Sequence, residues 1–266
     1  MSSLRIGPRP RFLTLCRITL ATVVLNVVTG AAVRLSDSGL GCPDWPTCSE
    51  HHLTPPLLLH PVIEFANRAV VTLLVVAFVE LWAWVNLLSA VLAVSATLFY
   101  VFVYTLWLKR TSSQNIVIGG AAGAVPVLVG WAAVTDGLAW TPVVLFAIIF
   151  VWTPPHFWAL AVKYKDDYRA ASVPMLPAVA TFKRTAREIF FYSVLLVAVS
   201  LVLAAVARLG PVYVVSASVL GVVFLALALR LWRQATPKAA MQLFSYSITY
   251  LTLLFVVMAA DIFIKH

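Results

Sequence analysis

Residues 152–168 read WTPPHFWALAVKYKDDY, so an apolar stretch ends in two adjacent carboxylates, Asp166 and Asp167. The apolar part belongs to a longer run over residues 139–162, and a helix needs about 20 such residues to cross a bilayer. Lys163 and Lys165 follow where that helix would leave the membrane. The stretch predicts a transmembrane helix with a charged end, where a metal ion could hold a phosphate group.

The composition extends this prediction to the whole chain of 266 residues, of which 62% are hydrophobic and only 11% are charged. Its mean hydropathy of +0.97 is typical of an integral membrane protein. The nearly uncharged runs are residues 13–33, 62–108, 114–135, 139–162, 188–207, 211–229 and 242–263. The second run is long enough for two crossings, and no run alternates apolar and polar residues as barrel strands do. We expect an all-α multi-pass membrane bundle of about eight transmembrane helices.

The formal charge of +9 comes from short basic clusters beside apolar runs. This placement indicates membrane orientation and anionic lipid headgroups rather than nucleic acid. The clusters are Lys109 with Arg110, residues 163–187, and residues 230–238, and two helices separate each from the next. The positive-inside rule therefore places all three in the cytoplasm, together with Asp166 and Asp167.

The amino terminus gives a conflicting signal. Arg5, Arg9, Arg11 and Arg17 precede the apolar stretch of residues 18–33, and no clear small-residue cleavage site precedes Arg34, so we expect a retained helix rather than a signal peptide. Counting helices back from Lys109 would place this terminus outside, whereas its arginines favour the inside. The join near residue 80 is therefore the uncertain part of the topology.

From about residue 82 onward, the chain closely resembles the protohaem IX farnesyltransferases, or haem O synthases. The resemblance rests on residues 85–88, 98–110, 114–124 and 152–177, and residues 245–251 resemble the last helix of the same family. It covers about two thirds of the chain. The family belongs to the intramembrane UbiA-type prenyltransferases, so the resemblance implies a helical bundle around a lateral cavity.

The same resemblance implies a reaction and a site. Two aspartate-rich motifs of the family hold Mg²⁺ against a prenyl diphosphate, and residues 164–168 match the second motif. Asp166 and Asp167 would hold the metal, Tyr164 belongs to the motif, and Lys165, Lys109 and Arg110 would contact phosphate. Farnesyl diphosphate and haem B would be the substrates, in a bacterial plasma membrane.

Simpler interpretations of these residues remain open. A paired aspartate beside Lys and Tyr is often only a solvated helix end. His156 could contact haem, because an ionisable side chain within a membrane usually faces a cavity, or it could be a polar residue in a helix that two prolines kink. Asn115 could bond within the cavity or cap the helix that follows it.

The amino-terminal third differs from the haem O synthases. No counterpart of the first aspartate-rich motif occurs before residue 82, and the chain is in this sense UbiA-like but incomplete. Instead, residues 28–35, 38–48 and 63–68 resemble the first two helices of haem A synthase. We therefore expect two segments, 1–81 and 82–266, and haem A synthase becomes a candidate partner. Asn67 stands where a haem-ligating His often lies in that family.

Cys42 and Cys48 lie in the loop between these first helices. The resemblance to haem A synthase implies an external loop in which this pair can form a disulfide. The alternative is a pair of unreacted thiols, and the nearby histidines fit no compact zinc spacing.

Two functions are therefore considered. The first is farnesyl transfer from farnesyl diphosphate to the vinyl group of haem B. The second is a non-catalytic haem-binding or assembly protein built from joined fragments of the two haem enzymes, which the missing first motif favours.

Overall fold

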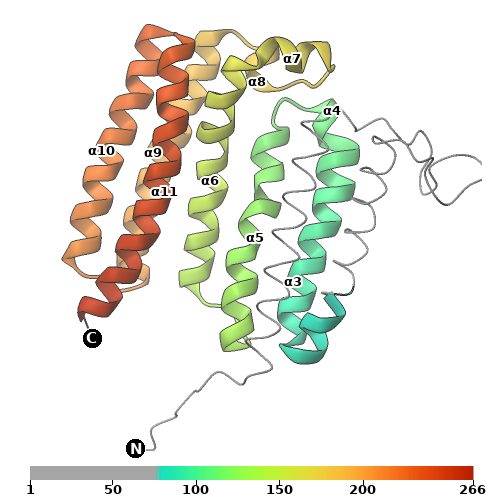
Figure 1. Cartoon of the computed structure of the whole chain (residues 1–266), viewed down its shortest axis with the longest axis vertical. Helices are drawn as coiled ribbons and strands as arrows, with labels where there is room; N and C mark the ends of the chain where they lie inside the picture. Colours follow the sequence, from blue (N-terminus) through green and yellow to red (C-terminus); the bar gives the residue numbers. More distant parts are fainter. Residues whose placement is uncertain (1–75, 77, 266) are drawn as a thin grey trace, which may run out of the picture. The chain divides into compact units, whose positions relative to one another are not determined.

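The computed structural model describes residue 76 and residues 78–265. All regular elements in this part of the chain are helices (Figure 1). The chain divides into two compact units, residues 1–90 and 91–266, with the division inside helix α3 (Leu87–Leu98). The expected all-α class is confirmed.

The described end of the first unit contains a helix break. Residues 78–84 are helical, Val85 and Asn86 leave the helical path, and α3 begins at Leu87. The Oδ1 atom of Asn86 accepts a hydrogen bond of 2.8 Å from the backbone N–H of Ser89. This bond satisfies one of the amides that a helix start leaves without an intrahelical partner.

The second unit consists of the rest of α3 and nine further elements. They are η2 (Phe99–Leu108), α4 (Lys109–Thr111), α5 (Asn115–Thr135), α6 (Trp140–Lys163), α7 (Lys165–Ala170), α8 (Leu176–Val179), α9 (Phe182–Val206), α10 (Pro211–Gln234) and α11 (Pro237–Lys265). The described residues include six spans long and apolar enough to cross a membrane, the first formed by α3, η2 and α4 together. These six correspond to the last six expected spans. The other two fall almost entirely outside the described residues, so the count of eight stays a prediction.

The η2 segment is a π-helix, in which backbone bonds reach five residues back instead of four. The Thr105 hydroxyl donates to the carbonyl of Tyr100, and the N–H of Lys109 donates to the carbonyl of Tyr104. Tyr104 lies so close to Gly119 that a methyl group there would be 2.3 Å from the tyrosine ring.

Helix α6 is central to the second unit. It packs against α5 on one side and against α9 and α11 on the other, while α10 packs against α9 and α11 (Figure 1). The largest fully buried side chains include Trp158, Tyr213, Phe224 and Tyr250. The Tyr250 hydroxyl donates to Ser200 Oγ at 2.9 Å. Many large apolar side chains on the outer helix faces are exposed, as a lipid-facing surface requires.

One end of the second unit carries its three basic clusters. Lys109 and Arg110 lie in α4, residues 163–187 run from the end of α6 into α9, and residues 230–238 connect α10 to α11 (Figure 1). The three clusters thus share a side, as the charge pattern predicts. The side of the membrane on which they lie stays a prediction, as does the segment boundary at residue 82.

At the opposite end of the second unit, Asp261 joins α11 to α10. Its carboxylate is buried and accepts hydrogen bonds from the backbone N–H groups of Gly210 and Tyr213 at the start of α10. A negative side chain at a helix amino terminus is favourable because the first amides lack partners and the helix dipole is positive there. Asp261 thereby anchors the end of α11 to the beginning of α10.

Candidate functional site

The candidate site lies at the basic end of the second unit, around the end of α6 and the short helices α7 and α8. The carboxylates Asp166 and Asp167 are in the first turn of α7, after a break at Tyr164 that ends α6. Both carboxylates are exposed. The short α7 therefore presents the pair at the end of the bundle rather than continuing α6 into the aqueous phase.

Arg169 holds the loop around these carboxylates in place. One guanidinium nitrogen, Nη1, donates to Asp166 Oδ1 at 3.0 Å, and Nε donates to the carbonyl of Ala178 at 2.8 Å. Arg169 thus connects α7 to α8. Of the two carboxylates in α7, only Asp166 makes an ion pair with a described residue. Sequence reasoning missed Arg169. The spacing of three from Asp166 was the available signal, because such residues are neighbours on a helix.

Asn115 approaches the same loop from α5. It is fully buried, and its Nδ2 donates to the carbonyl of Lys109 at 3.4 Å. Its Oδ1 has no hydrogen-bond partner in the described part of the chain. The capping interpretation is wrong, because Gln114 occupies the N-cap position and Asn115 is the first residue of the helix. This unpaired Oδ1 can accept a hydrogen bond or coordinate a cation.

Apolar packing joins the start of α5 to α8. Ile116, Met175 and Ala178 form a small buried cluster, with Tyr104 and Tyr168 packed against it. This cluster places Asn115, with Lys109 and Arg110 close by in the chain, at the same end as α7. Seven of the candidate residues therefore lie in elements at this one end of the second unit: Lys109, Arg110, Asn115, Tyr164, Lys165, Asp166 and Asp167.

His156 lies deeper, seven residues before the end of α6, or about 10 Å along the helix axis. The helix continues through Pro154 and Pro155, so these prolines do not break it at His156. The imidazole is buried and stacks on Trp152 with 4.1 Å between ring centroids, while Phe244 lies 4.7 Å away. His156 is thus held in an aromatic cage between α6 and α11.

Hydrogen bonding determines the tautomer of His156. Its Nδ1 is 2.7 Å from Ser247 Oγ, and that hydroxyl donates its only proton to the carbonyl of Phe244 at 2.6 Å. Because Ser247 has no second proton to give, Nδ1 must carry the proton of the imidazole and donate it. The other nitrogen, Nε2, then has a lone pair available for a donor or a metal ion.

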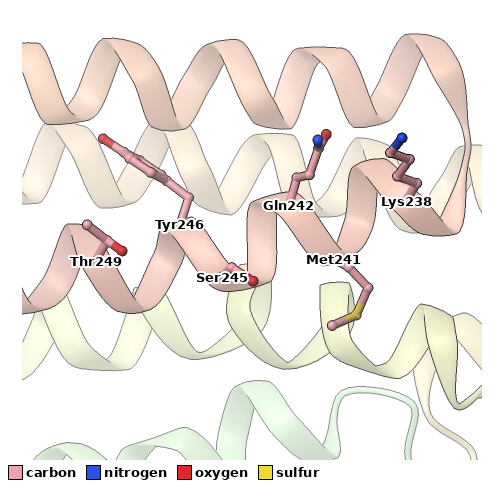
Figure 2. A pocket seen from close by; sticks show the side chains of 6 residues that line it. All are labelled: Lys238, Met241, Gln242, Ser245, Tyr246 and Thr249. Carbon is pink, nitrogen blue, oxygen red and sulfur yellow. The ribbon is translucent and has the colours of Figure 1, made fainter.

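The outer face of α11 has a shallow groove of about 500 Å³ (Figure 2). It is lined by Lys238, Met241, Gln242, Ser245, Tyr246 and Thr249. The Tyr246 hydroxyl donates to the carbonyl of Leu220 and so ties the groove to α10. None of the predicted site residues lines this groove, although Ser245 and Tyr246 lie in the segment that resembles the haem O synthases.

The charges at the basic end suit a magnesium ion that also binds phosphate. The described residues contain no group of three or more His, Cys, Asp or Glu side chains that could enclose a metal. Magnesium is commonly bound by one or two carboxylates together with water and substrate phosphate oxygens. Asp166 and Asp167 fit that donor set. Cys42 and Cys48 lie outside the described residues, so their pairing stays a prediction.

Comparisons with known proteins identify the family of this chain. The UbiA prenyltransferase family matches residues 63–256, a range that starts inside the segment resembling haem A synthase. A protein named protoheme IX farnesyltransferase from Parafrankia sp. (strain EAN1pec) is 54% identical over 208 residues, which are 76% of this chain and 66% of that protein. A protein of the same name from Gloeobacter violaceus is 55% identical over 188 residues, or 70% of this chain and 62% of its own length.

A third relative with this name, from Frankia alni, is 58% identical over 178 residues, which are 66% of this chain and 62% of the relative. The chain therefore spans less than two thirds of the length of these curated relatives. No solved structure matches the chain.

Proposed function

The chain belongs to the UbiA prenyltransferase family, and we propose that it transfers a farnesyl group from farnesyl diphosphate to a vinyl group of haem B, giving haem O. One observation carries this proposal: two adjacent carboxylates and several basic side chains lie at one end of an apolar bundle. The names of the relatives support the choice of substrates. The setting is a bacterial plasma membrane, with α7 on the cytoplasmic side.

The reaction separates charge at the basic end. The bond between the allylic carbon and the diphosphate oxygen breaks, and its electron pair leaves with the diphosphate. The haem vinyl group then supplies the electron pair for the new carbon–carbon bond, and water adds to the adjacent carbon and releases a proton. Side chains that neutralise the departing diphosphate lower the barrier because they act where negative charge develops.

Different residues of this chain have different roles in the proposed transfer. Asp166 and Asp167 would hold Mg²⁺, which when bound would stabilise the negative charge on the diphosphate. Lys165, Lys109 and Arg110 supply positive charge for phosphate oxygens, Tyr164 belongs to the same motif, and Asn115 offers its Oδ1 acceptor. Deeper in the bundle, His156 contacts haem, and the apolar side chains around it exclude water from the carbocation.

A second candidate is a non-catalytic protein that binds haem or helps assemble one of the haem enzymes, with haem A synthase as a candidate partner. The observation that favours it is that the other acidic residues in the described part of the chain, Glu80, Asp136, Glu188 and Asp261, are isolated in the sequence and form no second acidic motif. His156 and its aromatic cage would serve haem binding equally well without chemistry.

The experiment that separates these functions uses the purified protein in detergent. Farnesyl diphosphate and haem B are added with Mg²⁺, and the porphyrins are analysed by chromatography and mass spectrometry. Farnesyl transfer predicts haem O, which a chelator abolishes. Saturable haem binding without any haem O would reject the enzyme and leave the second candidate.

A further inference from the structure

The shallow groove on the outer face of α11 lies on the side of this helix that faces away from the core. Two of its lining residues, Ser245 and Thr249, are each two positions from Ser247, which is fully buried. Two positions along an α-helix correspond to a rotation of about 200°. Lys238 and Gln242 continue the same exposed stripe toward the basic end (Figure 2). The groove is therefore separate from the aromatic cage around Ser247.

The groove contains an exposed amide where the surroundings would be apolar. Helix α11 is long and apolar enough to span a membrane. The hydroxyls of Tyr246 and Ser247 donate to backbone carbonyls, whereas the side chain of Gln242 is exposed and makes no hydrogen bond to a described residue. A polar group that faces hydrocarbon without a partner is unfavourable. The two N–H donors of Gln242 therefore favour an occupant that brings a polar acceptor into the groove.

One wall of the groove is held in place by contacts with α10. The Tyr246 hydroxyl donates to the carbonyl of Leu220 at 2.9 Å, and its ring packs edge-on against Phe224 with 6.0 Å between centroids. Met241 adds a second apolar surface to the lining. The volume of about 500 Å³ is within the range of roughly 300–1,000 Å³ that is usual for small-molecule sites.

Positive charge lies at the end of the groove where α11 begins. Lys238 makes no ion pair among the described residues. It belongs to the basic cluster of residues 230–238, which includes Arg230 and Arg233 and contains no acidic side chain. Basic side chains at the end of a membrane span attract anionic lipid headgroups. The charge at this end of the groove is therefore complementary to a lipid phosphate.

The length of the groove corresponds to one leaflet of a bilayer. Lys238 and Thr249, the first and last lining residues, are eleven positions apart, or about 16 Å along the helix axis. The hydrocarbon core of a bilayer is about 30 Å thick, so one leaflet contributes roughly half of that. A lipid with its phosphate near Lys238 would thus extend its acyl chain past Thr249.

A second copy of the chain fits this stripe less well. Two copies inserted in the same direction are related by an axis along the membrane normal, so α11 would lie beside α11 in parallel. The two Lys238 side chains would then face each other, and like charges repel. Charge therefore favours an anionic lipid over a second copy.

We propose that the groove binds one anionic phospholipid of the leaflet at the basic end. Its phosphate pairs with Lys238, an ester carbonyl accepts a hydrogen bond from Gln242, and one acyl chain lies along Met241, Tyr246 and Thr249. The proposal goes beyond farnesyl transfer, because none of the candidate site residues lines this groove.

The test counts lipids that stay bound to the purified protein. The protein in a neutral detergent is titrated with dioleoyl-phosphatidylglycerol or dioleoyl-phosphatidylcholine, and the complexes are measured by native mass spectrometry. The wild type should bind one phosphatidylglycerol about fivefold or more tightly than phosphatidylcholine. Lys238→Gln should remove this preference, since one basic side chain near a headgroup accounts for about that factor. Gln242→Leu should weaken the binding of both lipids about fivefold, because a hydrogen-bond donor is lost.

Lys183→Gln is the matched control, since Lys183 is exposed in the first turn of α9, at the same end of the unit, but does not line the groove. It should keep the preference for phosphatidylglycerol. Gln242→Leu should melt at the same temperature as the wild type or higher without added lipid, because Leu is a good helix former and suits an apolar environment. Its weaker lipid binding would then not result from unfolding.

Three results would overturn the proposal. The first is a wild type without a preference for phosphatidylglycerol, or a preference that Lys183→Gln loses as fully as Lys238→Gln. The second is displacement of bound phosphatidylglycerol by farnesyl diphosphate, which would assign the groove to the substrate. The third is a single cysteine at position 242 that a membrane-permeant maleimide cannot label in delipidated protein, which would show that protein covers this face. Farnesyl transfer itself is tested separately, by the formation of haem O.

Discussion

At the residue scale, the environment of His156 depends on one hydroxyl. Ser247 accepts from His156 Nδ1 and donates to Phe244, while its backbone carbonyl accepts from Trp152 Nε1 at 2.8 Å. Ser247 therefore orients both aromatic rings that stack in the cage. Under the proposed function it is a positioning residue, which acts on haem through His156.

Replacing Ser247 by Ala should disturb haem binding more than folding. Nδ1 of His156 would lose its acceptor, and the ring could turn or change tautomer. We expect kcat/KM for haem B to fall about tenfold, which corresponds to about 1.4 kcal/mol, with a shifted absorption spectrum of the bound haem. Ser245→Ala is the control, because Ser245 is exposed in the groove on the outer face of α11. Identical haem spectra for both variants and the wild type would show that Ser247 does not position His156 for haem.

The proximity of site residues that are close in sequence could be predicted, whereas contacts between residues that are distant in sequence could not. Tyr164, Lys165, Asp166 and Asp167 form one continuous motif, so their proximity needs no tertiary information. Ser247 meets His156 from a helix 91 positions away.

At the element scale, the contact between η2 and α5 depends on a glycine. A Cβ at Gly119 would meet the ring of Tyr104 at 2.3 Å, whereas Gly123, one turn later, has nothing within 4 Å. Gly119→Ala should therefore destabilise the protein by about 1–3 kcal/mol through overpacking. Gly123→Ala should be neutral or stabilising by up to about 1 kcal/mol, because Ala favours helix. Melting temperatures in detergent test this pair, and equal values would show that Tyr104 moves aside freely.

The link between α10 and α11 gives a second prediction at this scale. Asp261→Ala removes the acceptor for two backbone N–H groups and should cost about 1–2 kcal/mol, the usual effect of losing a helix cap. Asp261→Asn retains one acceptor oxygen and should have an intermediate melting temperature. If both variants melted like the wild type, the carboxylate would contribute nothing to this end of the bundle.

Hydropathy predicts the existence of the described helices better than their ends. The apolar run at residues 188–207 corresponds to α9, which begins earlier, at Phe182. Thr181 caps it by accepting from the N–H of Arg184 at 3.3 Å, and the basic first turn lies outside the apolar run. In the same way, the π-helical register of η2 has no signal in an apolar run of this kind.

At the scale of the whole molecule, the three basic clusters share one end of the second unit. The positive-inside rule then predicts that this end faces the cytoplasm. A single cysteine at Ala171, in a chain whose native cysteines are replaced by serine, should resist a membrane-impermeant thiol reagent until cells are permeabilised. A cysteine at Leu138, in the opposite turn, should react in intact cells. The reverse labelling pattern would show that the basic end faces outward and would contradict this prediction.

The central claim is that the carboxylates of α7 take part in farnesyl transfer, and it is tested most directly by comparing two purified proteins. Asp167→Asn is preferred over Asp166→Asn, because Asp166 also pairs with Arg169 and its loss would disturb α7. With farnesyl diphosphate, haem B and Mg²⁺, the wild type should produce haem O, and Asp167→Asn should remain folded but lose almost all of this activity. Undiminished haem O formation by Asp167→Asn, or none by a well-folded wild type, would contradict the account.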